Sequence, residues 1–119
     1  MGKLILKSFK RIPREKERPF DYEYFNEKIL ITIGEEGKED YNKIFTLDAV
    51  SCDWLKTNLN KNNDESMYFQ YGVAMKYYNE VVLEYHIKRA LKRCNLELPE
   101  NRFDLLTHYL KYENEESLY

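Results

Sequence analysis

The sequence predicts an α+β fold, an antiparallel sheet of about four to five strands with two longer helices and one short helix packed against it. Apolar and polar residues alternate in two neighbouring segments, Tyr24 to Ile33 and Tyr41 to Val50, as in half-buried strands. Apolar residues recur at helical spacing after Asn79. The chain has 119 residues, 43% of them hydrophobic, which predicts one domain over residues 1–119 with a core of its own.

The first segments of the chain are expected to form a strand and then a loop. Lys3 to Phe9 predicts a short first strand. The stretch from Lys10 to Pro19 carries two prolines and clustered charge, with little to bury, and therefore predicts a loop. A basic arm that touches nucleic acid is the alternative interpretation, and the role of this stretch stays open.

The two alternating segments are expected to be the arms of a hairpin. Their apolar faces are Phe25, Ile29, Ile31 and Ile33 in the first arm and Phe45, Leu47 and Ala49 in the second. The connection "GEEGKED" between them has four carboxylates among seven residues, which would repel a phosphate, and it lacks the oxygen spacing of a calcium loop. We therefore expect a hairpin connection in which Gly34 or Gly37 has a positive φ.

A short helix is predicted after the second arm. Ser51 has the hydroxyl of an N-cap, and Asp53 suits the positive end of the helix dipole. Trp54 and Leu55 are interpreted as core anchors at the seam between hairpin and helix. With Trp54 and Phe45 buried, the change Trp54→Ala is expected to cost about 3 to 5 kcal/mol.

The second half of the chain predicts a strand and two helices. Met67 to Tyr78 is expected to be a strand, with Gly72 at a bulge or a close backbone approach. Asn79 caps the clearest helix, "EVVLEYHIKRALKRCN", and Pro99 permits a last one. The apolar helix faces are Leu83, Ile87, Ala90, Leu91 and Cys94, then Phe103, Leu106 and Leu110. Leu83 and Ile87 are expected on the same side of the sheet as Phe45. The final nine residues add a strand or fray.

The charge distribution argues against some classes of partner. The formal net charge of −2 disfavours wholesale binding to nucleic acid or to a membrane surface. Residues 1 to 19 carry a local +5, whereas residues 20 to 68 carry a local −6. No stretch approaches a membrane span, and the first apolar run is too short for a signal peptide, so we expect the cytoplasm.

The residue types that carry catalysis are scarce. Cys52 and Cys94 form no Cys-x-x-Cys pair and are expected to be reduced and partly buried. His86 and His108 lie on two different predicted helices, and no flanking signature makes either a base or a metal ligand. From the sequence we therefore expect that the protein is not an enzyme and that it has no catalytic residue, no metal site and no cofactor. A small enzyme would need a pocket that joins His108 and Cys94 to carboxylates.

The order of several short motifs resembles the immunity protein 8 family of bacterial polymorphic-toxin systems. The quoted stretches are "LKSF", "IGEEG", "FTLDAVSCDWL" and "YGVAMKYYN". The positions that carry the resemblance are Ser8, Phe9, Ile33, Gly34, Gly37, Phe45, Ser51 to Leu55, Gly72 and Tyr77. The chain departs from the family pattern in "RIPREKERP", where family members tend to be acidic.

The resemblance implies a cytoplasmic protein that binds and neutralises a cognate toxin domain, such as a nuclease-type effector of contact-dependent growth inhibition. A toxin that acts on nucleic acid presents positive charge, and an acidic inhibitor surface can occupy that site. The candidate toxin-contacting residues are Glu35, Glu36, Glu39 and Asp40. A merely solvated hairpin tip is the alternative for these residues. The alternative function is a small nucleic-acid-associated module that uses the basic stretch and the Lys88 to Arg93 cluster.

Overall fold

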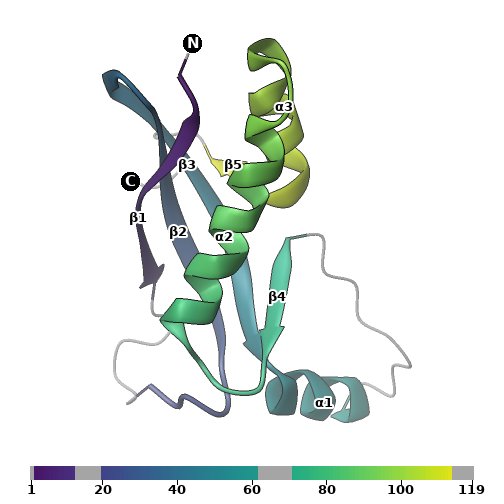
Figure 1. Cartoon of the computed structure of the whole chain (residues 1–119). Helices are drawn as coiled ribbons and strands as arrows, with labels where there is room; N and C mark the ends of the chain where they lie inside the picture. Colours follow the sequence, from purple (N-terminus) through teal and green to yellow (C-terminus); the bar gives the residue numbers. More distant parts are fainter. Residues whose placement is uncertain (1, 13–19, 62–70, 114–119) are drawn as a thin grey trace.

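The structure, a computed structural model, describes residues 2–12, 20–61 and 71–113 and has an α+β architecture (Figure 1). The strands are β1 (Leu4–Ile12), β2 (Asn26–Glu35), β3 (Lys38–Ser51), β4 (Gly72–Met75) and β5 (Lys111–Glu113). The helices are α1 (Cys52–Lys61), α2 (Glu80–Asn95) and α3 (Pro99–Tyr109). Helices α2 and α3 lie over one face of the sheet, as predicted, whereas α1 continues from the end of β3 and lies at the end of the sheet (Figure 1).

The sheet is mixed rather than purely antiparallel. Its order is β1-β2-β3-β4, and β5 also pairs with β3. The pairs β1–β2, β2–β3 and β3–β5 are antiparallel, but β4 runs parallel to the last four residues of β3. The expectation of an antiparallel sheet was therefore wrong at this strand. Helix α1 lies between β3 and β4, and a helical crossover is the usual way to bring a strand back in the same direction as its neighbour.

The predicted hairpin is confirmed, together with both of its apolar faces. Ile29 faces Leu47 and Ile31 faces Phe45 in the β2–β3 register. All seven apolar residues of the two faces are buried, from 0% to 4% exposed. Alternation with a period of two places these side chains on one face, which the helices then cover.

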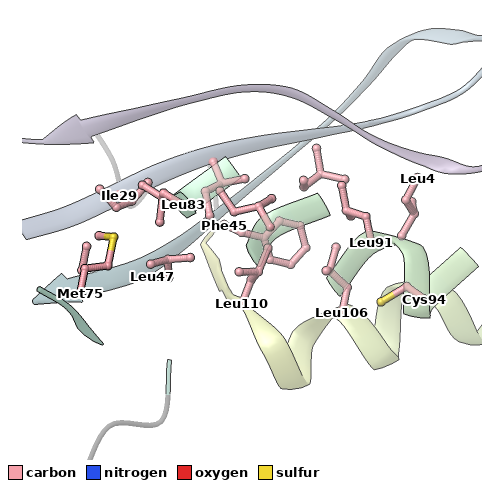
Figure 2. Packing of buried hydrophobic residues seen from close by; sticks show 14 of the residues in the cluster. Leu4, Ile29, Phe45, Leu47, Met75, Leu83, Leu91, Cys94, Leu106 and Leu110 are labelled. Atoms are coloured by element: carbon pink, nitrogen blue, oxygen red, sulfur yellow. The ribbon is translucent and has the colours of Figure 1, made fainter. Parts of the chain in front are cut away.

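Helix α2 confirms its predicted cap and its buried face. The Asn79 carboxamide oxygen accepts hydrogen bonds from the backbone N–H groups of Val81 and Val82. The buried residues of α2 are the five predicted ones, Leu83, Ile87, Ala90, Leu91 and Cys94. Figure 2 shows the core in which Ile29, Phe45 and Leu47 of the sheet meet Leu83 and Leu91 of α2 and Leu106 of α3.

The prediction for Trp54 was wrong. Phe45 is 0% exposed, but Trp54 and Leu55 are half-buried and belong to no part of the core cluster. The reason is the position of α1, which leaves the sheet at its end and cannot turn a side onto the core. In the stretch from Ser51 to Leu55 it is Ser51 that is fully buried. Its Oγ accepts hydrogen bonds from the N–H of Phe25 at 3.1 Å and of Trp54 at 3.0 Å.

Several predicted boundaries shift. β1 continues through Ile12, which pairs with Lys28, so residues 10–12 of the predicted loop are strand. In the described part of the strand predicted over Met67 to Tyr78, residues 71–78, the strand is β4, where Gly72 is the first residue and pairs with Asp48. Of the two alternatives for the final nine residues, the strand is found over Lys111–Glu113, as β5. The remainder of the predictions for residues 13–19, 62–70 and 114–119 falls outside the described residues.

Candidate functional site

The candidate carboxylates lie at the turn between β2 and β3, which we call the hairpin end. Glu36 and Gly37 form the turn itself, and Gly37 has the predicted positive φ, +84°. Glu35 does not project from a loop, contrary to the prediction: it is the last residue of β2 and only 5% exposed. Its carboxylate accepts from the Gly2 N–H at 3.1 Å and pairs with Lys38 at 3.5 Å, which ties it to the fold.

The other three candidates, Glu36, Glu39 and Asp40, are exposed. The β2–β3 register shifts between Ile33↔Lys43 and Glu35↔Lys38, so residues 39–42 of β3 have no counterpart in β2. Lysines accompany these carboxylates. The Lys7 ammonium donates to the Glu39 carbonyl at 3.0 Å and to Asn42 Oδ1 at 2.7 Å.

Gly34 has a different role from the one expected of the two glycines. Among the described glycines the positive φ belongs to Gly37 alone, and Gly34 is a buried residue of β2. A Cβ placed at Gly34 would collide with the side chain of Lys7. The missing side chain therefore leaves Lys7 room to cross β2 and to reach the extra residues of β3.

A second surface, which sequence reasoning did not single out, lies at the opposite end of β2. We call it the tyrosine end and define it by five exposed side chains: Tyr22, Tyr24, Tyr77, Val81 and Tyr85. Their exposed fractions run from 42% to 75%. β2 has ten residues, so about 30 Å of extended strand separates this end from the hairpin end.

One of the exposed tyrosines, Tyr22, rests on a packed aromatic base. Phe20 contacts Tyr22 and Tyr78 edge to face, with ring centroids 4.8 and 5.1 Å apart, and Phe25 contacts Tyr78 at 5.6 Å. The Arg11 guanidinium stacks over the Phe20 ring at 3.8 Å. Burial, followed by the charge of Glu80, raises the pKa of the Tyr78 hydroxyl, so Tyr78 stays neutral at physiological pH.

Short hydrogen bonds fix the segment that carries Tyr22 and Tyr24. Asp21 Oδ1 accepts from the N–H groups of Glu23 at 2.9 Å and Tyr24 at 3.1 Å. The Tyr78 N–H donates to the Tyr22 carbonyl at 2.7 Å, which joins this segment to the start of α2. Tyr22 and Tyr24 are thus held on ordered backbone, an arrangement that lowers the entropy a side chain would lose in a complex.

The exposed charges around Tyr22, Tyr24 and Tyr77 are mostly negative. Asp21, Glu23 and Glu80 are exposed in these segments, and Lys76 lies next to Tyr77, whereas exposed Lys88 and Arg89 follow Tyr85 on α2. Aromatic side chains with an acidic surround favour contact with a basic protein surface.

The cysteines and histidines give no sign of a reactive centre. Cys52 is exposed and Cys94 is buried; both are free. His86 and His108 are exposed, and His108 Nδ1 lies 2.9 Å from the Asp104 carbonyl oxygen of its own helix. Within residues 2–12, 20–61 and 71–113, no group of three or more His, Cys, Asp or Glu side chains could hold a metal ion. None of the helices in these ranges is long and apolar enough to cross a membrane.

No protein-family model, no curated protein and no solved structure matches this chain. The sequence did contain a signal for the tyrosine end, in "DYEYF" and "MKYYNEVV", where tyrosines stand next to carboxylates. The signal is ambiguous in sequence alone because Tyr78, one residue from exposed Tyr77, is buried.

Proposed function

We propose that this protein is an immunity protein that acts in the cytoplasm, where it binds and neutralises a cognate bacterial toxin domain by direct contact. The observation that carries the proposal is the tyrosine end, an exposed aromatic surface with an acidic surround. The sequence resemblance to the immunity protein 8 family supports the same function.

The chemistry of the tyrosine end suits a protein partner. Tyrosine supplies a large apolar ring and a hydroxyl while losing little entropy, and it is enriched among the residues that dominate binding energy. Tyr22 and Tyr77 are 60% and 54% exposed, yet each is adjacent to ordered, packed backbone. We therefore assign these two residues as the anchors of the toxin complex. A toxin that acts on nucleic acid carries the positive charge that Asp21 and Glu23 would attract.

The hairpin end has a separate part in the proposal. Glu36, Glu39 and Asp40 are exposed carboxylates and lie at or near the toxin interface, where they speed encounter by long-range attraction. Glu35 has no part in this because its carboxylate is buried and paired.

The test uses the C-terminal domain of a secreted protein encoded directly upstream of this chain. That domain is expressed in a bacterial host with and without this protein, and growth is measured. We expect rescue of growth and a stable one-to-one complex. The double variant Y22A/Y77A is expected to raise the Kd about a hundredfold through faster dissociation, because each anchor contributes on the order of 1 to 2 kcal/mol.

The matched control is Y109A/Y112A, which removes two tyrosines that are also exposed but lie at α3 and β5. It is expected to leave the Kd within about threefold. The triple variant E36Q/E39Q/D40N tests steering: we expect slower association at low salt and no change at high salt. No rescue and no complex would overturn the proposed function, whereas rescue without sensitivity to Y22A/Y77A would relocate the binding surface.

The alternative function is a small nucleic-acid-associated module. One observation favours it: Lys88, Arg89, Lys92 and Arg93 are all exposed on the second half of α2. Binding of this protein to single- or double-stranded RNA or DNA, with a Kd that rises steeply with salt, would support the module. Loss of that binding in K88E/K92E would assign it to α2.

A further inference from the structure

An open groove of about 490 Å³ runs between strand β1 and helix α2. Apolar side chains from both elements line it, among them Leu6 of β1, Leu91 of α2 and Leu96 just beyond α2. Leu96 is 82% exposed, so this apolar wall is open to a partner. The groove lies along the second half of α2, whereas the tyrosine end lies at the first half of that helix.

The groove borders an edge of the sheet. In the described part of the chain β1 stands first in the strand order and pairs with β2 only. Asn95 forms with this edge the pair of hydrogen bonds that a neighbouring strand would form. Its carboxamide accepts from the Leu4 N–H at 2.8 Å and donates to the Leu4 carbonyl at 3.0 Å. On the other side of β1, the Lys3 carbonyl accepts from the Glu36 N–H. Backbone groups alternate along a strand, so those of Leu6 point to the same outer edge as those of Leu4.

The charges of the groove select the kind of strand that can pair there. Lys3, Lys88 and Lys92 line it and are exposed, and no carboxylate side chain belongs to the lining. Lysines that lie beside an edge strand, as Lys3 does before β1 and Lys88 and Lys92 do on α2, discourage two copies of one chain from pairing through that edge, since like charges would meet. Lys88 contacts Glu84 at 3.1 Å, an exposed pair that a ligand carboxylate can replace at little cost.

We propose that the groove binds an extended acidic segment of a partner protein, which adds a strand to the outer edge of β1 beyond Leu4. Its main chain pairs with β1, its apolar side chains contact Leu6 and Leu96, and its carboxylates pair with Lys88 and Lys92. This mode of recognition draws affinity from main-chain hydrogen bonds and specificity from alternate side chains. The inference does not rest on the proposed function, because it concerns a groove that shares no residue with the tyrosine end.

A nucleic acid fits this groove less well than a peptide does. The walls are largely apolar and present no aromatic ring on which a base could stack. A phosphate backbone would use the lysines but would leave the leucines and the strand edge without partners.

The first test uses a short fluorescein-labelled peptide of alternating glutamate and leucine, measured by fluorescence anisotropy with the full chain. The double variant K88E/K92E is expected to weaken binding at least about tenfold, since it replaces two attractions by two repulsions. The matched control K56E/K76E changes the charge equally at two exposed lysines of other segments and is expected to bind within about twofold of the parent. Equal loss in both variants, or no binding by the parent, would overturn the proposal.

The second test asks whether the peptide pairs as a strand. Two peptides are made, one N-methylated on the glutamate nitrogens and one on the leucine nitrogens. Strand addition uses the N–H groups of one alternating set only, so we expect one peptide to lose binding and the other to keep it. Loss in both or in neither overturns strand addition, and so does tighter binding of single-stranded oligo-dT than of the parent peptide in the same assay.

Discussion

The hairpin end and the tyrosine end lie at opposite ends of β2, and both carry several carboxylates. They differ in how they are held. The hairpin end depends on backbone geometry, with a positive φ at Gly37 and with Lys7 crossing Gly34 to reach β3. The tyrosine end depends on packing, through the rings around Tyr78 and the buried hydroxyl of Ser51.

The difference teaches that acidic residues in a sequence do not translate directly into an acidic surface. Of the four carboxylates expected at the hairpin end, Glu35 is buried and engaged by Gly2 and Lys38. At the tyrosine end the carboxylates are fewer, but they stand beside large exposed rings. For a binding protein the second arrangement combines charge with contact area.

The reactivities of the two cysteines probe the two ends separately. Cys52 is the first residue of α1, near the tyrosine end, and Cys94 is the next-to-last residue of α2, near Leu4. We expect a thiol reagent at pH 8 to label Cys52 at once and Cys94 at least about a hundredfold more slowly, if the opening that exposes Cys94 costs about 3 kcal/mol. Burial also raises the pKa of the Cys94 thiol to about 11, which keeps it protonated. Mass spectrometry after timed quenching measures both labelling rates, and the variants C52S and C94S show which rate belongs to which cysteine. Equal rates would mean that the core beside α2 opens freely.

Ser51→Ala is expected to lower the free energy of unfolding by about 2 to 3 kcal/mol, because it leaves the Phe25 and Trp54 amides without their acceptor. Trp54→Ala is expected to cost less, about 1 to 2 kcal/mol, since its side chain is half-buried. Urea unfolding measures both costs, with Ser8→Ala, a change at an exposed serine of β1, as the control. A larger cost for Trp54→Ala than for Ser51→Ala would instead support the sequence-based prediction that Trp54 is a core anchor.

Gly37→Ala is expected to cost about 1 kcal/mol, because a side chain is disfavoured at a φ of +84°. Nothing lies within 4 Å of the added Cβ, so the cost is conformational rather than steric. Gly37→Asn is the control, since Asn tolerates positive φ better, and it should recover part of the loss in urea unfolding. An alanine variant as stable as the parent would contradict the turn geometry.

Gly34→Ala has the smallest expected effect, about 0.5 kcal/mol, because the colliding Lys7 side chain is flexible and exposed. Its test is a double-mutant cycle with Lys7→Ala. Once Lys7 is shortened the added methyl group has room, so the two costs should not add. Additive costs would show that Gly34 serves some purpose other than the passage of Lys7.

The sequence by itself determined the local features of this protein. Period-two alternation identified both arms of the hairpin and their buried faces, helical spacing identified all five buried residues of α2, and Asn79 and Ser51 were recognised as caps. These features depend on residues close together in the chain, so their physics is readable from order alone.

Only the tertiary structure decided how distant segments meet. The direction of β4, the displacement of Trp54 from the core, the burial of Glu35 and the passage of Lys7 over Gly34 each depend on segments that are remote in sequence. Thr46 is an example: the alternation places it on the polar face, yet it is 2% exposed and its hydroxyl donates to Glu113 of β5 at 3.1 Å. A polar residue can be buried wherever another element supplies its hydrogen bond, and that partner is set by the fold.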